Sequence, residues 1–343
     1  MWHPHSDAFM DILDKEVGIG NIDYIVVNHA EPDHAGTLGE ILDRRPDIPI
    51  YCSVRGADII RRHFHKDWNF RTVKTGDTLS IGKCELFFVD MTMIHWPDSM
   101  MTFVKGPNVL LSNDAFGQHY AGASIFEDEA DEDVVWQEAI KYYAVILNPF
   151  SALIRKKVDE IRKLNLPIEI IAPSHGAIWR KEPLRIIGKY AQWADNYHDG
   201  RVTIVYDTMY HATGKMAEAI ALGLESKGVK CRLFNSSISD ISDIVTELFK
   251  SKGIIVGSCT VNNGTLRSIA GVLEEIRGHK FKDKVGAAFG SYGWSGESPK
   301  IIYKDLKEAG IKMAADPIAV QYQPDEKELE ACVQFGRDFA RYL

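Results

Sequence analysis

The sequence has few cysteines, no long apolar run and no block of basic residues. Each of these absences excludes a class of protein. The five cysteines stand singly, without a Cys-x-x-Cys pair, which argues against a disulfide framework and a cysteine-ligated metal centre. No apolar run approaches the roughly 18 residues that span a bilayer, and the first residues do not resemble an export signal. Basic residues number 40 against 48 acidic ones and form no stripe. We therefore expect a cytoplasmic protein that binds neither membrane nor nucleic acid.

The length of 343 residues, with 45% hydrophobic and 26% charged residues, is typical of a soluble protein with two domains. A polar segment, 190–200, is closed by Asp199 and Gly200 and is a candidate boundary. We predict one domain over residues 1–199 and a second over residues 200–343.

Short apolar runs alternate with helical patterns from Gly200 onward. Uninterrupted apolar strands between amphipathic helices are typical of a parallel sheet covered by helices on both faces. The pattern predicts a doubly wound α/β domain. Its predicted strands are 202–206, 231–234, 253–257 and 285–289, and its predicted helices are 215–226, 241–250, 266–277 and 299–309.

The first 150 residues contain short strands and irregularly placed helical stretches, and they predict a mixed α/β domain. Two longer helical patterns and one more strand follow before the boundary. The predicted strands are 24–27, 49–52, 85–89, 109–111 and 168–172, and the predicted helices are 133–145 and 151–164.

Candidate metal ligands crowd the segment Asn28–His34, directly after a predicted strand. The spacing of two residues directs His29, Glu31 and Asp33 the same way, so their side chains can converge on one point. An isolated His-x-Glu motif is more often a solvated turn. Three further donors, however, each follow another predicted strand, and they are His95, Asp114 and His175.

With His34, the candidates comprise four imidazoles and three carboxylates. Seven donors exceed what one tetrahedral zinc ion needs, and they suit two metals that share a bridging carboxylate. The sequence therefore predicts a two-metal site at a row of strand ends.

In the second domain, the first predicted strand leads into the loop 207–215 and then into a helix. The hydroxyls of Thr208 and Thr213, with backbone N–H groups and the helix N-terminus, can hold one terminal phosphate. The spacing matches neither a P-loop nor a G-x-G-x-x-G turn. A mononucleotide is therefore favoured over a dinucleotide or a nucleoside triphosphate.

Two later strands end in loops rich in small residues, and the carboxyl ends of strands in such sheets meet at the ligand. Small residues let the backbone approach a flat ring, and Tyr292 or Trp294 can lie against it. The candidate cofactor residues are Thr208, Met209, Tyr210, His211, Ala212 and Thr213 in the first loop, Ser258, Cys259, Thr260, Val261, Asn262, Asn263 and Gly264 in the second, and Ser291, Tyr292, Gly293 and Trp294 in the third.

At these residues the chain resembles the flavodiiron proteins, in which a metallo-β-lactamase-like αβ/βα sandwich precedes a flavodoxin-like domain. Hydrolases of the metallo-β-lactamase fold carry His-x-His-x-Asp-His, and here Glu31 stands at the second histidine, as in the flavodiiron branch. An anionic ligand in place of a neutral imidazole favours iron over zinc.

The resemblance implies the roles of the seven metal ligands. One iron is expected on His29, Glu31 and His95, the other on Asp33, His34 and His175, and Asp114 is expected to bridge them. In the family the position of His34 is sometimes left off the metal, so His34 has a second possible role as a hydrogen-bonding neighbour.

The resemblance also implies FMN on the three loops and an oxidoreductase that reduces O₂ to water or NO to N₂O. It implies a head-to-tail homodimer, because flavin and irons of one family chain lie too far apart for direct transfer. No Cys-x-x-Cys pair follows the flavin loops, so the expected donor is a separate rubredoxin or rubredoxin reductase.

Two other functions stay open on the sequence: a zinc-dependent hydrolase of the same fold, and a flavodoxin-type electron carrier with an inactive metal site. Family members carry a longer segment before the first ligand than the 28 residues found here. We therefore expect early strands of the metal domain to be absent from this sequence.

Overall fold

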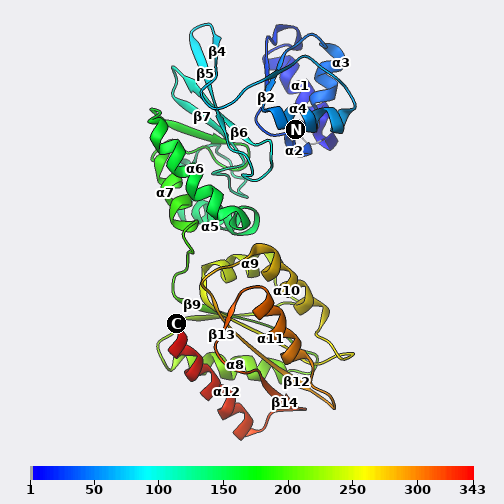
Figure 1. Ribbon diagram of the computed structural model, residues 1–343, viewed down its shortest axis with the longest axis vertical. Coiled ribbons are helices and arrows are strands. Elements are labelled where there is room, and N and C mark those ends of the chain that lie inside the picture. The colour runs from blue at the N-terminus through cyan, green and yellow to red at the C-terminus, as the bar shows by residue number, and fades with distance from the viewer. Residues whose placement is uncertain (1–2) are drawn as a thin grey trace. The chain divides into compact units, whose positions relative to one another are not determined.

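The chain forms two compact units of helices and strands (Figure 1). The computed structural model describes residues 3–343. The first unit runs to Tyr142 and resumes over Phe150–Gln192, and the second comprises Tyr143–Pro149 and Trp193–Leu343. Among the described residues, no helix combines the length and apolar character that a membrane span requires.

The first sheet of the first unit is parallel, in the order β1 (Ile25–Val27), β2 (Ile50–Cys52), β3 (Phe70–Thr72). Alternate residues of its strands pack on α1 (Ser6–Glu16), α3 (Leu38–Arg44) and α4 (Val54–Phe64), with Ile50 and Cys52 fully buried. This alternation is the period of two that places successive side chains on opposite faces.

The second sheet has the order β4 (Thr78–Ile81), β5 (Cys84–Asp90), β6 (Met100–Lys105), β7 (Val109–Asn113), β8 (Ile170–Pro173). All its pairs are antiparallel except the last, in which β7 and β8 run parallel. The helices of this half are α5 (Glu132–Tyr142), α6 (Ser151–Leu164) and α7 (Leu184–Trp193).

The two sheets face each other across an apolar cluster. Val26 and Tyr51, from the first sheet, pack against Leu86, Phe88 and Met100 from the second. The rings of Tyr51 and Phe88 are nearly parallel, with centroids 6.2 Å apart. The expected αβ/βα sandwich is therefore confirmed.

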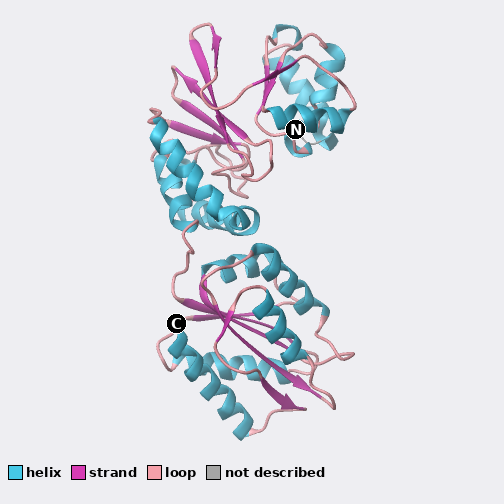
Figure 2. Cartoon of the chain, viewed as in Figure 1, coloured by secondary structure: helices cyan, strands magenta, loops and turns pink. Residues whose placement is uncertain are grey.

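The second unit is a doubly wound sheet in which every pair is parallel. The strand order is β10-β9-β11-β12, with β13 and β14 both pairing with β12, and this is the flavodoxin-like order. Helices cover both faces (Figure 2). The elements are β9 (Arg201–Asp207), α8 (Ala212–Glu225), β10 (Cys231–Asn235), α9 (Ile241–Lys250), β11 (Ser251–Ser258), α10 (Arg267–His279), β12 (Val285–Tyr292), α11 (Ser298–Glu308), β13 (Lys312–Met313), β14 (Ile318–Gln321) and α12 (Glu326–Phe339).

Helices α8 and α12 lie on one face of this sheet and meet through two glycines (Figure 1). A Cβ at Gly223 would lie 2.1 Å from the carbonyl oxygen of Val333, and one at Gly336 would lie 2.2 Å from that of Ile220. Since no side chain fits at such distances, glycine at both positions sets how closely the two helices pack.

The helix predicted over 133–145 is wrong at its end. The α-helix stops at Tyr142, and a π-helical turn follows over Tyr143–Leu147. This turn belongs to the second unit, where Tyr143 packs on Trp193 and Phe249. Its aromatic and apolar residues follow helical periodicity in the sequence, but tertiary packing decides the conformation.

Candidate metal centre and cofactor pocket

The four loops that carry the candidate ligands follow β1, β5, β7 and β8 at one end of the sandwich. Asn28 joins the first of these loops to the second sheet. Its carboxamide oxygen accepts from Thr102 Oγ1 at 2.7 Å, its amide donates to Leu111 O at 3.3 Å, and its carbonyl accepts from Met100 N at 2.8 Å. One asparagine at the end of β1 thus holds the two sheets together beside the ligands.

The extended spacing predicted for His29, Glu31 and Asp33 is wrong. Helix α2 (Pro32–Ala35) begins directly after Glu31, so Asp33 and His34 project from a helical turn. Pro32 explains the change, because proline fixes φ near the helical value and is favoured at the first position of a helix. The turn separates the two carboxylates, so Glu31 and Asp33 meet different histidines.

Glu31 joins the first pair of imidazoles. Its Oε2 lies 3.0 Å from His29 Nε2 and 3.3 Å from His95 Nε2. His29 is fully buried, whereas the side chain of Glu31 is about one-third exposed. These three side chains come from the loops after β1 and β5, and their ligand atoms face one another.

Asp33 joins the second pair. Its Oδ2 lies 3.4 Å from His34 Nε2 and 3.3 Å from His175 Nε2. The rings of His34 and His175 meet edge to face, with centroids 5.0 Å apart. The structure therefore brings His34 as close to this group as His175.

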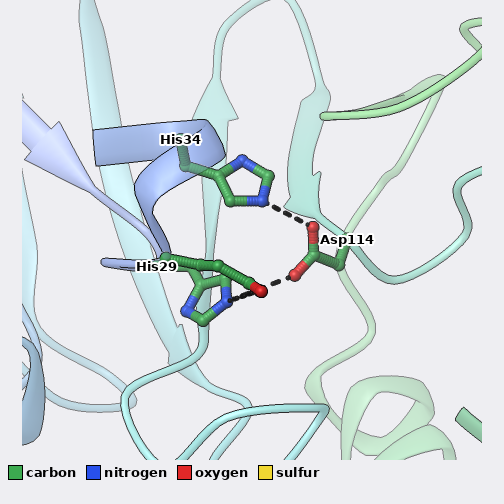
Figure 3. A group of neighbouring side chains, drawn as sticks. His29, His34 and Asp114 are labelled. Carbon is green, nitrogen blue, oxygen red and sulfur yellow. Dashed lines mark hydrogen bonds and ion pairs between the residues drawn. The ribbon is translucent and has the colours of Figure 1, made fainter. Parts of the chain in front are cut away.

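Asp114 lies between the two groups and turns one oxygen to each. Oδ2 is 3.5 Å from Nε2 of both His29 and His95, and Oδ1 is 2.9 Å from His34 Nε2 and 3.3 Å from His175 Nε2. Figure 3 shows His29 and His34 directed toward this carboxylate from different sides. A single carboxylate thus divides four imidazoles into two pairs.

The donor set fits two metal ions. The ligand atoms of His29, Glu31, His34 and Asp114 all lie within 4.8 Å of one another, as do those of Asp33, His34 and His175. Ligands about 2.1 Å from a common ion are separated by at most about 4.2 Å, so small movements would close each group on a cation. Three carboxylates gathered at one site, with Asp114 fully buried, also need positive charge to offset them.

The electrostatics of the site agree with a place for cations. Burial alone would raise the pKa of Asp114, but hydrogen bonds from His175, His34 and His95 outweigh burial and hold its pKa well below the usual range. Burial would likewise lower the pKa of His29, yet the neighbouring carboxylates raise it. Asp114 is therefore an anion at any physiological pH.

Two residues that the sequence did not single out support the loops after β7 and β8. Gln118 is fully buried; its Oε1 accepts from Ala177 N at 2.6 Å and its Nε2 donates to Ala177 O at 3.2 Å. Tyr142 lies against His175. Burial, and to a smaller extent the nearby charge of Asp114, raises the pKa of the Tyr142 phenol. Neither carries a local sequence signal, since each depends on neighbours far along the chain.

In the second unit, a cavity of about 650 Å³ opens at the carboxyl ends of β9, β11, β12 and β14, within the range of small-molecule sites. Most predicted cofactor residues line it. Those on its wall are Thr208, Met209, Tyr210, Ala212, Cys259, Thr260, Val261, Asn262, Ser291, Tyr292, Gly293 and Trp294.

The remaining predicted cofactor residues occupy other positions. Thr213 and Ser258 are fully buried, and the Thr213 hydroxyl pairs with Ser291 Oγ at 2.9 Å. His211 precedes α8 in the left-handed conformation, with φ of 66°. Gly264 closes a tight turn with Val261, and Asn263 bonds Glu297.

Thr208 differs from Thr213 in one respect that fits a phosphate. Its Oγ1 is buried, and no described residue forms a hydrogen bond with it. Unpaired buried hydroxyls are uncommon in folded proteins, and this one lies in the loop that leads to the N-terminus of α8. Of the predicted pair, Thr208 is therefore the residue whose hydroxyl is available to a ligand.

A fourth loop, missed in the sequence, completes the cavity with Tyr322 and Gln323. Gln323 donates to Tyr210 O at 2.8 Å and accepts from Lys215 Nζ at 3.0 Å, so it ties this loop to the phosphate loop. Gln321 donates to Gly293 O at 2.8 Å and ties it to the third loop. The loop follows β14, and the apolar residues Ile318, Ala319 and Val320 are the sequence signal that could have predicted this strand.

The family models agree with this pairing of sites. The model of the ODP family beta lactamase matches residues 4–176, and the flavodoxin model matches residues 204–336. The chain is 47% identical over 343 residues to the anaerobic nitric oxide reductase flavorubredoxin of Klebsiella pneumoniae, covering 99% of this chain and 71% of that protein. The chain belongs to the flavodiiron protein family.

Solved structures of other flavodiiron proteins have the same fold. Rubredoxin oxygen:oxidoreductase from Desulfovibrio gigas is 34% identical, with a TM-score of 0.96 over 99% of this chain and 86% of that one. The flavodiiron protein of Giardia intestinalis is 29% identical, with a TM-score of 0.95 over 100% of this chain and 85% of that one.

Proposed function

We propose that this flavodiiron protein takes electrons from a redox partner at an FMN in residues 200–343. It uses them at a two-iron centre in residues 1–199 to reduce O₂ to water, NO to N₂O, or both. The observation that carries the proposal is the position of Asp114, whose two oxygens face separate pairs of imidazoles. A site for a single zinc ion would not need a carboxylate between two pairs of imidazoles.

The family resemblance supplies the ligand roles, and the distances support them, with His34 close to both groups. His29, Glu31 and His95 would hold one iron, Asp33, His34 and His175 the other, and Asp114 would bridge them. A donor set rich in carboxylates suits iron, whereas structural zinc is usually bound by imidazoles and thiolates. When bound, the two irons supply the electrons that reduce the gas, and the protein fixes their spacing and charge.

The lining of the cavity supports the flavin roles. Thr208 and the N-terminus of α8 would hold the FMN phosphate. The segments Cys259–Asn262 and Ser291–Trp294, at the ends of β11 and β12, would hold the ring. The wall has aromatic side chains at Tyr292 and Trp294, which suit a flat conjugated ligand.

The relatives support both gases as substrates. One is named a nitric oxide reductase flavorubredoxin and another a rubredoxin oxygen:oxidoreductase. These names also support a rubredoxin or a rubredoxin reductase as the electron donor. Cytoplasmic location is part of the proposal and agrees with five free cysteines.

We also propose a head-to-tail homodimer. Large side chains at the mouth of the cavity are exposed: Trp294 is 90% exposed, Tyr210 77% and Tyr322 64%. Exposed aromatic side chains around a site are typical of surfaces that a partner covers. Light scattering should give twice the chain mass, and a monomer at all concentrations would refute the dimer.

The decisive experiment measures cofactors and turnover together. Purified protein should contain about two irons and one FMN per chain. When a rubredoxin that was reduced anaerobically supplies it with electrons, the protein should consume NO and O₂. Asp114→Asn should lose iron and both activities while retaining FMN. Zinc with esterase or thioesterase activity would support the hydrolase instead, and FMN without any metal would support the electron carrier.

A further inference from the structure

Asp98 is a buried carboxylate that the ligand roles above leave unexplained. Its side chain is 1% exposed, and a carboxylate so deeply buried needs hydrogen bonds to offset the loss of water. Oδ1 lies 3.1 Å from Nδ1 of His29, and Oδ2 accepts from the backbone N–H of Ala30 at 2.7 Å. Asp98 therefore contacts His29 on the side away from the metal centre.

This contact decides which nitrogen of His29 carries the proton. A neutral imidazole has one N–H group and one lone pair, and a carboxylate beside Nδ1 favours the N–H there. Nε2 then keeps its lone pair, and this nitrogen faces Glu31 and Asp114. Trp96 fixes the ring from another direction, edge to face at 5.0 Å.

Asp98 also joins the two loops that supply this half of the centre. It lies three residues after His95 in the loop between β5 and β6, whose ends are held by the bond from Met91 N to Ser99 O. Its carbonyl accepts from Ser53 Oγ at 2.9 Å, and Ser53 caps α4. A single residue thus connects the His95 loop to His29 and to the end of β2.

We propose that Asp98 is the positioning residue for one half of the metal centre, the half made by His29, Glu31 and His95. It holds His29 in the tautomer that can bind a cation and keeps the His95 loop against it. The identity of the cation as iron rests on the proposed function, whereas the tautomer of His29 does not.

The informative substitution is Asp98→Asn, which keeps the size of the side chain. The carboxylate accepts from two N–H groups, those of His29 and Ala30. The amide of asparagine has one oxygen that accepts and one NH₂ group that donates. Its NH₂ group must therefore either face the N–H of Ala30 or His29, or face Nδ1 of His29 and force the His29 proton onto Nε2. In the second case Nε2 has no lone pair for a metal.

Iron retention tests the assignment to one half. Loss of such supporting contacts typically weakens metal binding about 10- to 100-fold. At a chelator concentration that leaves the wild type with both irons, Asp98→Asn should retain about one per chain. Thr203→Val is the matched control, because it removes a buried hydroxyl bond, to Ser251 Oγ at 2.7 Å, in the second unit, which holds none of the proposed ligands, and it should retain both.

A second measurement does not depend on iron or activity. In the metal-free wild type at alkaline pH, ¹⁵N chemical shifts of His29 should show the proton on Nδ1, and in Asp98→Asn they should show a shift toward Nε2. A wild-type proton on Nε2, or equal loss of both irons in Asp98→Asn, would overturn the proposal. A wild type with the Nδ1 proton but no iron would instead refute the proposed function alone.

Discussion

The two hydroxyls of the phosphate loop should differ sharply in their effect on FMN binding. Thr208 Oγ1 is buried without a hydrogen-bond partner among the described residues, whereas Thr213 Oγ1 is committed to Ser291 at 2.9 Å. We therefore expect Thr208→Val to weaken the binding of FMN but to change the binding of riboflavin, which lacks the phosphate, very little.

The size of the effect follows from one hydrogen bond to a charged group. Such bonds contribute about 1.5 to 3 kcal/mol, and every 1.4 kcal/mol is about tenfold in affinity. Thr208→Val should therefore raise the Kd for FMN by about 10- to 150-fold. Thr213→Val removes a bond inside the protein, so it should lower stability while leaving the ratio of the FMN and riboflavin Kd values unchanged.

Quenching of flavin fluorescence on titration into the flavin-free protein gives both dissociation constants. The ratio of the two Kd values isolates the phosphate contribution, because changes in ring binding affect both ligands. If Thr208→Val weakens both flavins equally, or if only Thr213→Val alters the ratio, the assignment of the phosphate contact to Thr208 is wrong.

Two further predictions concern other parts of the second unit. Gln323→Ala removes two exposed hydrogen bonds, to Tyr210 O and from Lys215 Nζ. It should raise the Kd for FMN several-fold, about 1 kcal/mol, in the same titration, and an unchanged Kd would show that the fourth loop does not support the phosphate loop. Burial lowers the pKa of Lys284 to about 7, so between that pH and its ordinary 10.5 the unfolded chain binds the extra proton, and the wild type should gain up to about 4 to 5 kcal/mol of stability over Lys284→Met as the pH rises through this window. Urea unfolding of both proteins near pH 6.5 and 9.5 should show about 3 kcal/mol of that gain, because the upper pH lies within the window. An equal difference at both pH values would show that the carbonyls around the ammonium keep it charged.

The sequence alone could predict which residues gather at the two sites, because both sites lie at strand ends. Apolar strands are visible as local patterns, and the residues after each strand end must occupy neighbouring loops at one edge of a sheet. The doubly wound sheet follows from the same strands, whereas the residues alone predicted only a mixed α/β first domain, and the family resemblance implied the sandwich. Local patterns therefore suffice for the choice of candidates.

The same patterns could not predict how the side chains pair. Pro32 starts a helical turn, and this turn, rather than the period of two, directs Glu31 and Asp33 to different histidines. Asp98 meets a histidine 69 positions away, and Gln118 meets a backbone 59 positions away. Contacts of this separation depend on tertiary packing, which no local motif encodes.

The position of Asp114 between the two pairs of imidazoles follows from the place of its strand in the sheet. β7 lies between β6, which continues from the His95 loop, and β8, which leads to His175. A carboxylate at the end of β7 therefore emerges between the two histidine loops, whereas one at the end of β5 or β8 would reach a single loop. The mixed pairing of β7, antiparallel on one side and parallel on the other, thus places one anion where both pairs of imidazoles can share it.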